Sequence, residues 1–347
     1  DILNNISETR GGGIYVTGGA TSSELDITNC NINSNRAQIS GGGLYMASSS
    51  TDVDITGTTI SSNTVVGFGE FSGGGIYVSN GSLDMTNSSI NNNWNEYTEG
   101  GGMYVNIGTV NLTSVNVNGN YTGGAGGGIF NDEGEVNMDN CVIKNNRDDD
   151  VETSGAGLYF ANEANGSLNN SLVQGNRSVG DGGGLYIENG GNLECENTTF
   201  YQNHADDDGG AIYVSYGTLT LCNVTLGQNT ADDEGDFVHV VEADVVFDCV
   251  YIGILNDDLT IEQFENWIDG ADMYCYTQGT GRLVGHTASS VTYSLGTPTL
   301  GHTPLVVTAP TGNTFGASVV DYTIDLVALN FPSLCYWDIT HMSGSDP

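Results

Sequence analysis

Hydrophobic residues recur along the first two thirds of the chain at fixed distances before an asparagine. In each repeat an apolar residue lies three positions before the asparagine, and further apolar residues mostly lie two, five and seven positions before that residue. The pairs are Ile2/Asn5, Ile32/Asn35, Ile60/Asn63, Ile90/Asn93, Val117/Asn120, Ile143/Asn146, Val173/Asn176, Phe200/Asn203 and Leu226/Asn229. A spacing of two is typical of the inward-facing residues of a β-strand, and the odd step between the two apolar pairs predicts a bend.

A glycine cluster followed by an apolar and an aromatic residue lies between successive asparagines. The copies begin at Gly11, Gly41, Gly73, Gly100, Gly126, Gly155, Gly182 and Gly209, at intervals of 26 to 32 residues. A repeat of this length indicates a solenoid, a propeller or an array. We expect the glycines to supply a positive φ or a close approach of backbones, and the asparagines to adopt the left-handed conformation and to bond to adjacent turns.

Each repeat therefore predicts one strand at the glycine cluster, a second through the first apolar pair, a third short strand ending before the asparagine, and a variable loop. Three strands in a coil indicate a parallel β-helix. A propeller blade needs about 40 to 45 residues, and the Leu-x-x-Leu-x-Leu frame and the helical stripe of other repeats are missing. We predict an all-β protein, a right-handed parallel β-helix of about nine coils over residues 1–256.

The residue after each glycine-apolar step forms an aromatic column. Its members are Tyr15, Tyr45, Tyr77, Tyr104, Phe130, Tyr159, Tyr186 and Tyr213. Stacked rings of this kind either pack as a ladder or lie outside, where they could hold sugar rings. We favour the packing ladder.

The repeat weakens after Asn229, where Gly235-Asp236-Phe237 replaces the next glycine cluster. For residues 257–347 we predict a short capping helix, over 259–268 with Thr260 and Gln263 at capping-box spacing, and then a β-rich module. Its strands are expected near residues 291–295, 305–308 and 319–326.

The charge of the chain limits its partners. Six Lys and Arg against 43 Asp and Glu give a formal net charge of −37, which argues against nucleic acid and anionic membranes and favours cations. No apolar run is long enough to predict a membrane span, and no basic-then-apolar leader begins the chain, so we expect residue 1 to follow processing or truncation.

An acidic cluster is the first candidate site. Asp206, Asp207 and Asp208 follow Asn203 at the offset at which Asp232, Asp233 and Glu234 follow Asn229, so adjacent coils are expected to bring the six carboxylates together. Opposed like charges need a bound cation or free solvation. Oxygen ligands would suit Ca²⁺. A calcium site and a solvated acidic loop both stay open.

Basic residues recur at one corner of the repeat. Arg36, Arg147, Arg177 and His204 each follow the asparagine directly. We favour local charge balance, and the alternative is a subsite for an anion or a sugar carboxylate. By resemblance to pectate lyases, which share this fold, Asp207 with Arg177 could imitate a calcium-dependent catalytic pair.

The cysteines point to a secreted protein, whereas Asn, Ser and Thr are so common here that sequons also arise by chance. Cys30, Cys141 and Cys195 fall on inward positions, whereas Cys222 with Cys249, and Cys275 with Cys335, are disulfide candidates. Ten Asn-x-Ser/Thr sequons include Asn80, Asn87, Asn111 and Asn197, which would be glycosylated in a eukaryotic secretory pathway.

Phe200-Tyr201-Gln202-Asn203 with Gly209-Gly210-Ala211-Ile212 resembles the repeats of the chlamydial polymorphic outer membrane proteins, and the likeness extends over about residues 1–256. The resemblance implies a secreted passenger with a role in surface display or adhesion. We expect a non-enzymatic extracellular structural or adhesive protein whose partners are further copies, joined head to tail into a fibre through the edge of the first coil, or polysaccharide and cell-surface components. The alternative is a carbohydrate-active β-helix that binds or cleaves polysaccharide.

Overall fold

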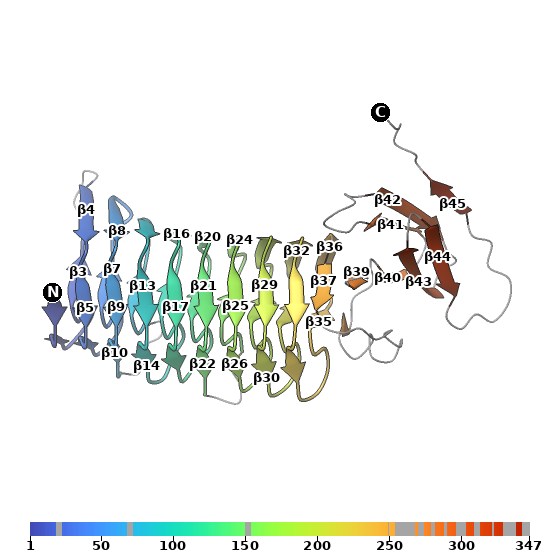
Figure 1. The fold of residues 1–347 in the computed structure, drawn as a ribbon. Helices are drawn as coiled ribbons and strands as arrows, with labels where there is room; N and C mark the ends of the chain where they lie inside the picture. The colour runs from blue at the N-terminus through green and yellow to red at the C-terminus, as the bar shows by residue number, and fades with distance from the viewer. Residues whose placement is uncertain are drawn as a thin grey trace.

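The computed structural model describes residues 1–18, 23–67, 72–149, 154–248 and 250–253, together with the backbone of eight later strands. The chain winds into nine successive coils stacked along one axis (Figure 1). Each coil contributes four strands, as the first coil shows with β1 (Ile2–Leu3), β2 (Ile6–Ser7), β3 (Ile14–Val16) and β4 (Ser23–Thr28). Equivalent strands of successive coils pair in parallel, so the coils build four sheets that run along the rod.

The first two sheets flank the asparagine. The first sheet continues through β5 (Asn31–Asn33), β9 (Thr59–Ser61), β13 (Ser89–Asn91), β17 (Asn116–Asn118), β21 (Val142–Lys144), β25 (Leu172–Gln174), β29 (Thr199–Tyr201), β33 (Thr225–Gly227) and β37 (Val250–Gly253). The second sheet continues through β6 (Arg36–Ala37), β10 (Thr64–Val65), β14 (Trp94–Asn95), β18 (Tyr121–Thr122), β22 (Arg147–Asp148), β26 (Arg177–Ser178), β30 (His204–Ala205) and β34 (Thr230–Ala231).

The other two sheets follow the glycine cluster. The third sheet continues through β7 (Leu44–Met46), β11 (Ile76–Val78), β15 (Met103–Val105), β19 (Ile129–Asn131), β23 (Leu158–Phe160), β27 (Leu185–Glu188), β31 (Ile212–Ser215), β35 (Val238–Val241) and β38 (Ile268–Asp269). The fourth continues through β8 (Thr51–Thr56), β12 (Ser82–Thr86), β16 (Thr109–Thr113), β20 (Glu135–Asp139), β24 (Asn165–Asn169), β28 (Asn192–Glu196), β32 (Thr218–Cys222) and β36 (Asp244–Asp248).

The predicted all-β parallel β-helix of about nine coils is confirmed, with one correction to the coil. The residues directly after the asparagine, expected to open a variable loop, form the two-residue strands of the second sheet. Two residues are too few to show a periodicity in the sequence. Each coil thus has four strands instead of three.

One hydrophobic core fills the rod from end to end. It is built from the apolar positions that define the repeat, and Ile32, Ile60, Ile90, Val117 and Ile143 stack in register at zero exposure. Cys141 and Cys195 are buried in this core and Cys30 packs against it, as predicted. These three thiols are free.

The glycine clusters hold the corner between the second and third sheets. The first glycine of most clusters has a positive φ, such as 64° at Gly41. A side chain at the third glycine of the same cluster, Gly43, would lie 2.8 Å from the carbonyl oxygen of Gly75 and 2.9 Å from the amide of Asn63. Both predicted uses of glycine are present, at different positions of one cluster.

The repeated asparagines form a buried ladder along the rod. The Nδ2 of Asn63 donates to the carbonyl oxygen of Ile32 in the preceding coil, at 2.9 Å, and to Oδ1 of Asn93 in the next, at 3.0 Å. The same pattern runs from Asn5 to Asn229. The predicted bonds to adjacent coils are confirmed, but the left-handed residue is the one before the asparagine: Ser62, for example, has a φ of 52°.

The aromatic column is a packing ladder, as favoured from the sequence. Consecutive rings from Tyr15 to Tyr213 stack with centroids 4.6 to 5.2 Å apart. Tyr104 is completely buried, and Tyr45, Tyr77, Phe130 and Tyr159 are less than a tenth exposed. Only the rings near the ends are more open, so this column is unsuited to holding sugar rings.

Parallel pairing continues past residue 256. β38 pairs with β35, and β39 (Tyr274–Gln278) pairs with β37. Antiparallel strands β40 (Arg282–Thr287), β43 (Asn313–Val320) and β44 (Thr323–Ala328) extend this edge, and β41 (Ser290–Leu295), β42 (Thr303–Thr308) and β45 (Asp338–His341) form a separate antiparallel sheet. The expected β-rich module is present, with the strand expected over 319–326 divided between β43 and β44. The predicted capping helix lies outside the described residues except for Ile268, which begins β38.

Candidate functional site

The acidic loops of the eighth and ninth coils lie directly after the second sheet. Asp206–Asp208 follow β30 and Asp232–Glu234 follow β34, and the backbone N–H of Asp233 donates to the carbonyl oxygen of Asp207 at 3.2 Å. The two loops therefore lie side by side, as the spacing predicted. Two histidines lie among these carboxylates, and the pKa of Asp207 is raised by burial and by the charges of Asp233, Asp208, Asp206 and Asp232.

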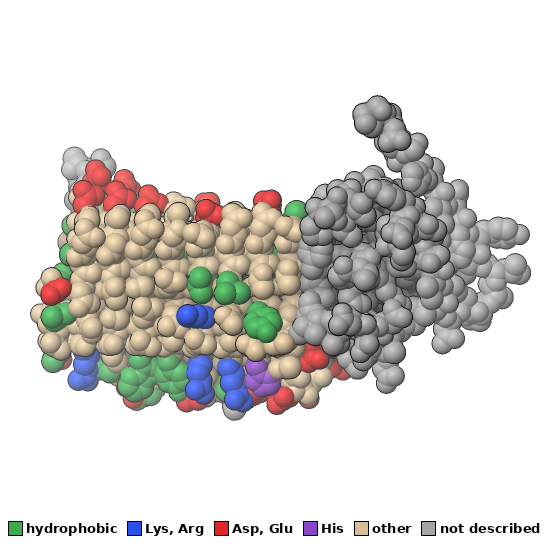
Figure 2. Space-filling model, viewed as in Figure 1, with side chains coloured by type: hydrophobic (Ala, Val, Ile, Leu, Met, Phe, Trp, Pro, Cys, Tyr) green, Lys and Arg blue, Asp and Glu red, His purple; other side chains and the backbone are tan. Residues whose placement is uncertain are grey.

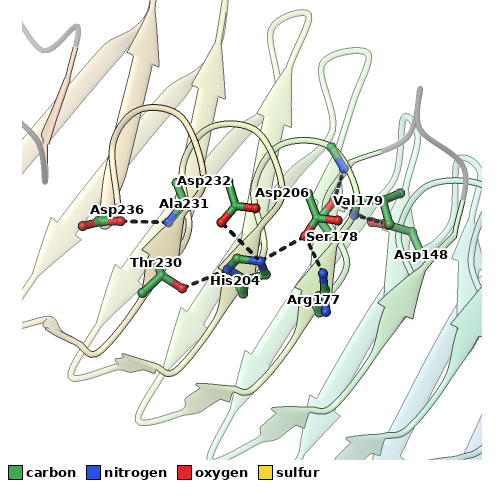
Figure 3. A network of polar contacts seen from close by, with 11 residues as sticks. Asp148, Arg177, Ser178, Val179, His204, Asp206, Thr230, Ala231, Asp232 and Asp236 are labelled. Carbon is green, nitrogen blue, oxygen red and sulfur yellow. Dashed lines mark hydrogen bonds and ion pairs between the residues drawn. The ribbon is translucent and has the colours of Figure 1, made fainter.

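His204 organises the first of two clusters (Figure 3). Its Nε2 lies 3.0 Å from Oδ1 of Asp206 and 3.9 Å from Oδ1 of Asp232. Its Nδ1 lies 2.9 Å from Oγ1 of Thr230, which fixes the orientation of the ring. Arg177 donates to the same oxygen of Asp206 at 2.8 Å. Asp206 therefore shares its charge between two cationic or polar side chains.

His239 organises the second cluster. Its Nε2 lies 3.9 Å from Oδ2 of Asp208, and the possible ligand atoms of Asp208, Glu234 and His239 lie within 4.8 Å of one another. The carboxylates also bind backbone: Asp208 accepts the N–H of Glu234 at 2.8 Å, and Asp181 accepts the N–H of Asp208 at 3.0 Å. The ring of His239 stacks on Tyr213 and so prolongs the aromatic ladder by one member.

These two clusters change the expected metal chemistry. Each offers one imidazole nitrogen with two carboxylates, a donor set that suits a transition-metal ion better than Ca²⁺, which prefers six or more oxygens. Asp207 and Asp233 belong to neither cluster, and Arg177 pairs with Asp206 rather than with Asp207. Calcium binding by the acidic loops stays a prediction.

A buried carboxylate lies two coils before the first of these loops. Asp148, the second residue of β22, points inward at 1% exposure and accepts hydrogen bonds from the hydroxyl of Ser178 and the N–H of Val179, each at 2.7 Å. Burial raises the pKa of Asp148 to about 7, and the neighbouring Asp206 and Asp149 act in the same direction. The Asp148 carboxyl therefore changes its charge near neutral pH.

The basic residues noted in the sequence belong to a longer exposed column, which we call the outer stripe. It consists of the first residue of each strand of the second sheet, paired coil to coil: Ile6, Arg36, Thr64, Trp94, Tyr121, Arg147, Arg177, His204 and Thr230. Figure 2 shows hydrophobic, basic and histidine side chains following one another along the lower edge of the rod.

Sequence reasoning found the basic members of the outer stripe but missed its aromatic ones. Trp94 and Tyr121 also follow a ladder asparagine directly, and their rings lie 6.4 Å apart at an angle of 43°. Trp94 is 41% exposed. Partial burial, together with a hydrogen bond to Asp149, raises the pKa of Tyr121 to about 12, so its hydroxyl keeps its proton. The position after the asparagine was the signal that could have found them.

The remaining candidates are placed as follows. Asn87 and Asn197 are exposed at left-handed turns, whereas Asn80 and Asn111 are half-buried, and Asn111 bonds to Asp84 at 2.7 Å. Cys222 lies half-buried at the end of β32; Cys249 and Cys335 lie outside the described residues, and only the backbone of Cys275 is described. Disulfide pairing and glycosylation stay predictions.

Two family descriptions match the chain. "Right handed beta helix region" matches residues 12–181, and "Chlamydia polymorphic membrane protein repeat" matches residues 197–215. No curated protein and no solved structure matches significantly. The stacked coils and these matches define a right-handed parallel β-helix protein.

More particularly, its repeat at residues 197–215 is similar to those of the chlamydial polymorphic membrane proteins, as the resemblance of Phe200–Asn203 and Gly209–Ile212 indicated. The two matches together suggest a surface-type protein. Among the described residues, no helix is long and apolar enough to cross a membrane.

Proposed function

We propose that the protein is a non-enzymatic, extracellular β-helix rod that serves as a structural or adhesive element of a cell surface. One observation carries this proposal: the side chains that repeat in every coil are used in packing. The asparagine ladder, the aromatic ladder and the glycine corners recur because each coil must fit the next. Such a protein is a rigid scaffold, and its variable surface positions are free to make contacts.

The rod is suited to display because its length grows by a constant step. Nine coils at about 4.8 Å each make a rod on the order of 40 Å long. Four sheets bonded along the axis resist bending. A rigid spacer holds an adhesive surface away from its attachment point without the entropy cost of a flexible linker.

Labelling of intact cells tests the surface location. An antibody raised against the purified chain should label unpermeabilised source cells as strongly as permeabilised ones, and brief protease treatment of intact cells should remove the label. Labelling that requires permeabilisation would contradict the proposal.

The non-enzymatic part has its own test, because a carbohydrate-active enzyme is the rival function. Purified protein incubated with neutral and acidic polysaccharides, with and without Ca²⁺, should release neither reducing ends nor unsaturated products. Turnover of any of them would favour the rival, and Asp206→Asn and His204→Ala would then locate the activity in the first cluster.

Head-to-tail assembly into a fibre is the finer part of the proposal. Every coil presents the next with the same row of backbone donors and acceptors, so a coil of a second copy could continue the stack. Sedimentation velocity over a concentration series, with electron microscopy of the largest species, measures this directly. Rods that lengthen in steps of one subunit are expected, and a monomer at all concentrations would contradict assembly.

A further inference from the structure

The outer stripe combines aromatic and basic side chains, which are common in binding surfaces, and these side chains lie in a single row along the rod. Trp94, Tyr121, Arg147 and Arg177 occupy four consecutive coils, so two rings and two guanidinium groups follow one another along the rod. Three of the six Lys and Arg residues in the whole chain lie on this stripe. The chain thus places half of its rare basic groups and an exposed tryptophan in one row.

The stripe contributes one outward residue per coil, and the next exposed residues along the chain, such as Asn92 and Asp149, lie two positions away. On one side each member is preceded by a buried ladder asparagine, such as Asn93 and Asn120, and on the other it is followed by an inward residue such as Asn95, Thr122 or Asp148. A stable protein–protein contact needs a broad patch of about 800 Å² on each partner. A narrow row about 40 Å long instead matches a linear polymer that lies along the axis.

Charge and backbone geometry select among linear polymers. The net charge of −37 repels nucleic acids and other polyanions. Acidic groups lie among the basic ones of the stripe, because Arg177 pairs with Asp206 at 2.8 Å and Tyr121 bonds to Asp149. An extended peptide binds a sheet through an open edge. The backbone bonds of the second sheet run between coils, so its outward face offers side chains only.

We propose that the outer stripe binds an uncharged polysaccharide chain lying along the rod. A sugar ring has a flat face of C–H groups that packs on an aromatic ring, and hydroxyls around its edge that bond to charged and amide side chains. Trp94 and Tyr121 supply the rings. Arg147, Arg177 and Asp206 supply donors and acceptors in the next coils, one position for each step of the rod.

This inference rests on the proposed adhesive function. Its test uses purified protein and polysaccharides, so that polysaccharide binding and the surface location can each be contradicted independently. Native gels containing a soluble β-glucan, α-glucan, galactomannan or xylan measure retardation, with alginate and pectate as acidic comparators. At least one uncharged polysaccharide should retard the wild-type protein. Trp94→Ala should weaken that binding about tenfold, Tyr121→Ala by a similar factor, and Trp94→Phe by less because a ring remains.

Tyr216→Ala is the matched control, because Tyr216 is an exposed aromatic residue, at 56%, that lies off the stripe. It should bind as the wild type does, and all variants should keep the wild-type melting midpoint. The proposal is overturned if no uncharged polysaccharide retards the protein, if Trp94→Ala binds normally, or if only the acidic polysaccharides bind. If one of these results is obtained while intact cells are still labelled by the antibody, the proposed polysaccharide ligand is wrong but the proposed surface location holds.

Discussion

Two aromatic columns run along the same rod, and they differ in every property that matters for function. The ladder from Tyr45 to Tyr159 has a ring in every coil and is buried. The outer stripe has aromatic rings only at Trp94, Tyr121 and His204, and its side chains are at least partly exposed. Residues that every coil repeats are required by the stacking of coils, whereas a column that varies from coil to coil is free to be shaped by a partner. Identity along a column therefore marks packing, and variation marks positions where packing does not dictate the residue.

The largest expected effect comes from emptying the buried column. Tyr104→Ala removes a ring at zero exposure, together with its 3.0 Å hydrogen bond to Asp132, and should lower the free energy of unfolding by about 3–5 kcal/mol. Tyr15→Ala, at the 50% exposed end of the same ladder, is the control and should cost much less. Denaturant unfolding measures both, and equal losses would mean that burial does not distinguish the two ends.

Breaking the asparagine ladder should come next. Asn120→Ala leaves the backbone N–H and the Nδ2 of Asn93 without their acceptor, at a cost of about 1–3 kcal/mol. Asn118→Ala, two residues earlier on the outer face of β17, should change the unfolding free energy by less than about 0.5 kcal/mol. If the two variants unfold alike, the ladder is not a source of stability.

The carboxyl beneath the outer stripe should make stability depend on pH. Because the folded pKa of Asp148 is raised to about 7, above its unfolded value, its contribution is present at acid pH and is lost as pH rises through about 7. The free energy of unfolding of Asp148→Asn, measured relative to that of wild type, should therefore be about 2 kcal/mol higher at pH 8 than at pH 5. Unfolding of both proteins at the two pH values measures this difference, and a constant difference would show that Asp148 does not titrate there.

The smallest expected effect is that of calcium. Ca²⁺ bound by the acidic loops should raise the melting midpoint by a few degrees, or about 1 kcal/mol at ten times its Kd. EGTA should reverse the rise, and Asp232→Asn should abolish it. An unchanged midpoint with EGTA would speak against a bound calcium ion. A rise produced by Zn²⁺ but not by Ca²⁺ would instead match the imidazole of His204 or His239.

The fold could be predicted almost completely from the sequence, because each coil is local and its rules repeat. The two-residue strands were missed since a strand such as Arg36–Ala37 has no periodicity. Gly235 keeps the positive φ of the corner at 65°, so the irregular cluster that it begins still forms a coil, within the β-helix predicted over residues 1–256.

The site could be predicted only in part, and for a physical reason. A search for residues that recur at one position of the repeat finds columns of like residues. It therefore found the basic residues that follow the asparagines, but not Trp94 and Tyr121, which occur there once each. The second cluster of the acidic loops depends on His239. The sequence around Phe237 departs from the repeat, but in the structure His239 occupies the next position of the aromatic ladder, stacked on Tyr213. Contacts between coils depend on the direction in which each side chain points. That direction follows from the position of the residue in its strand, and the sequence pattern alone did not give all four strands of the coil.

The most direct test of this account measures both columns in one experiment. Trp94→Ala and Tyr104→Phe are compared with wild type for retardation by the uncharged polysaccharide that wild type binds best and for the free energy of unfolding. We predict that Trp94→Ala loses about tenfold in binding with unchanged stability, and that Tyr104→Phe loses about 1 kcal/mol of stability with unchanged binding. Equal effects of the two variants on both quantities, or binding lost only in Tyr104→Phe, would contradict the account.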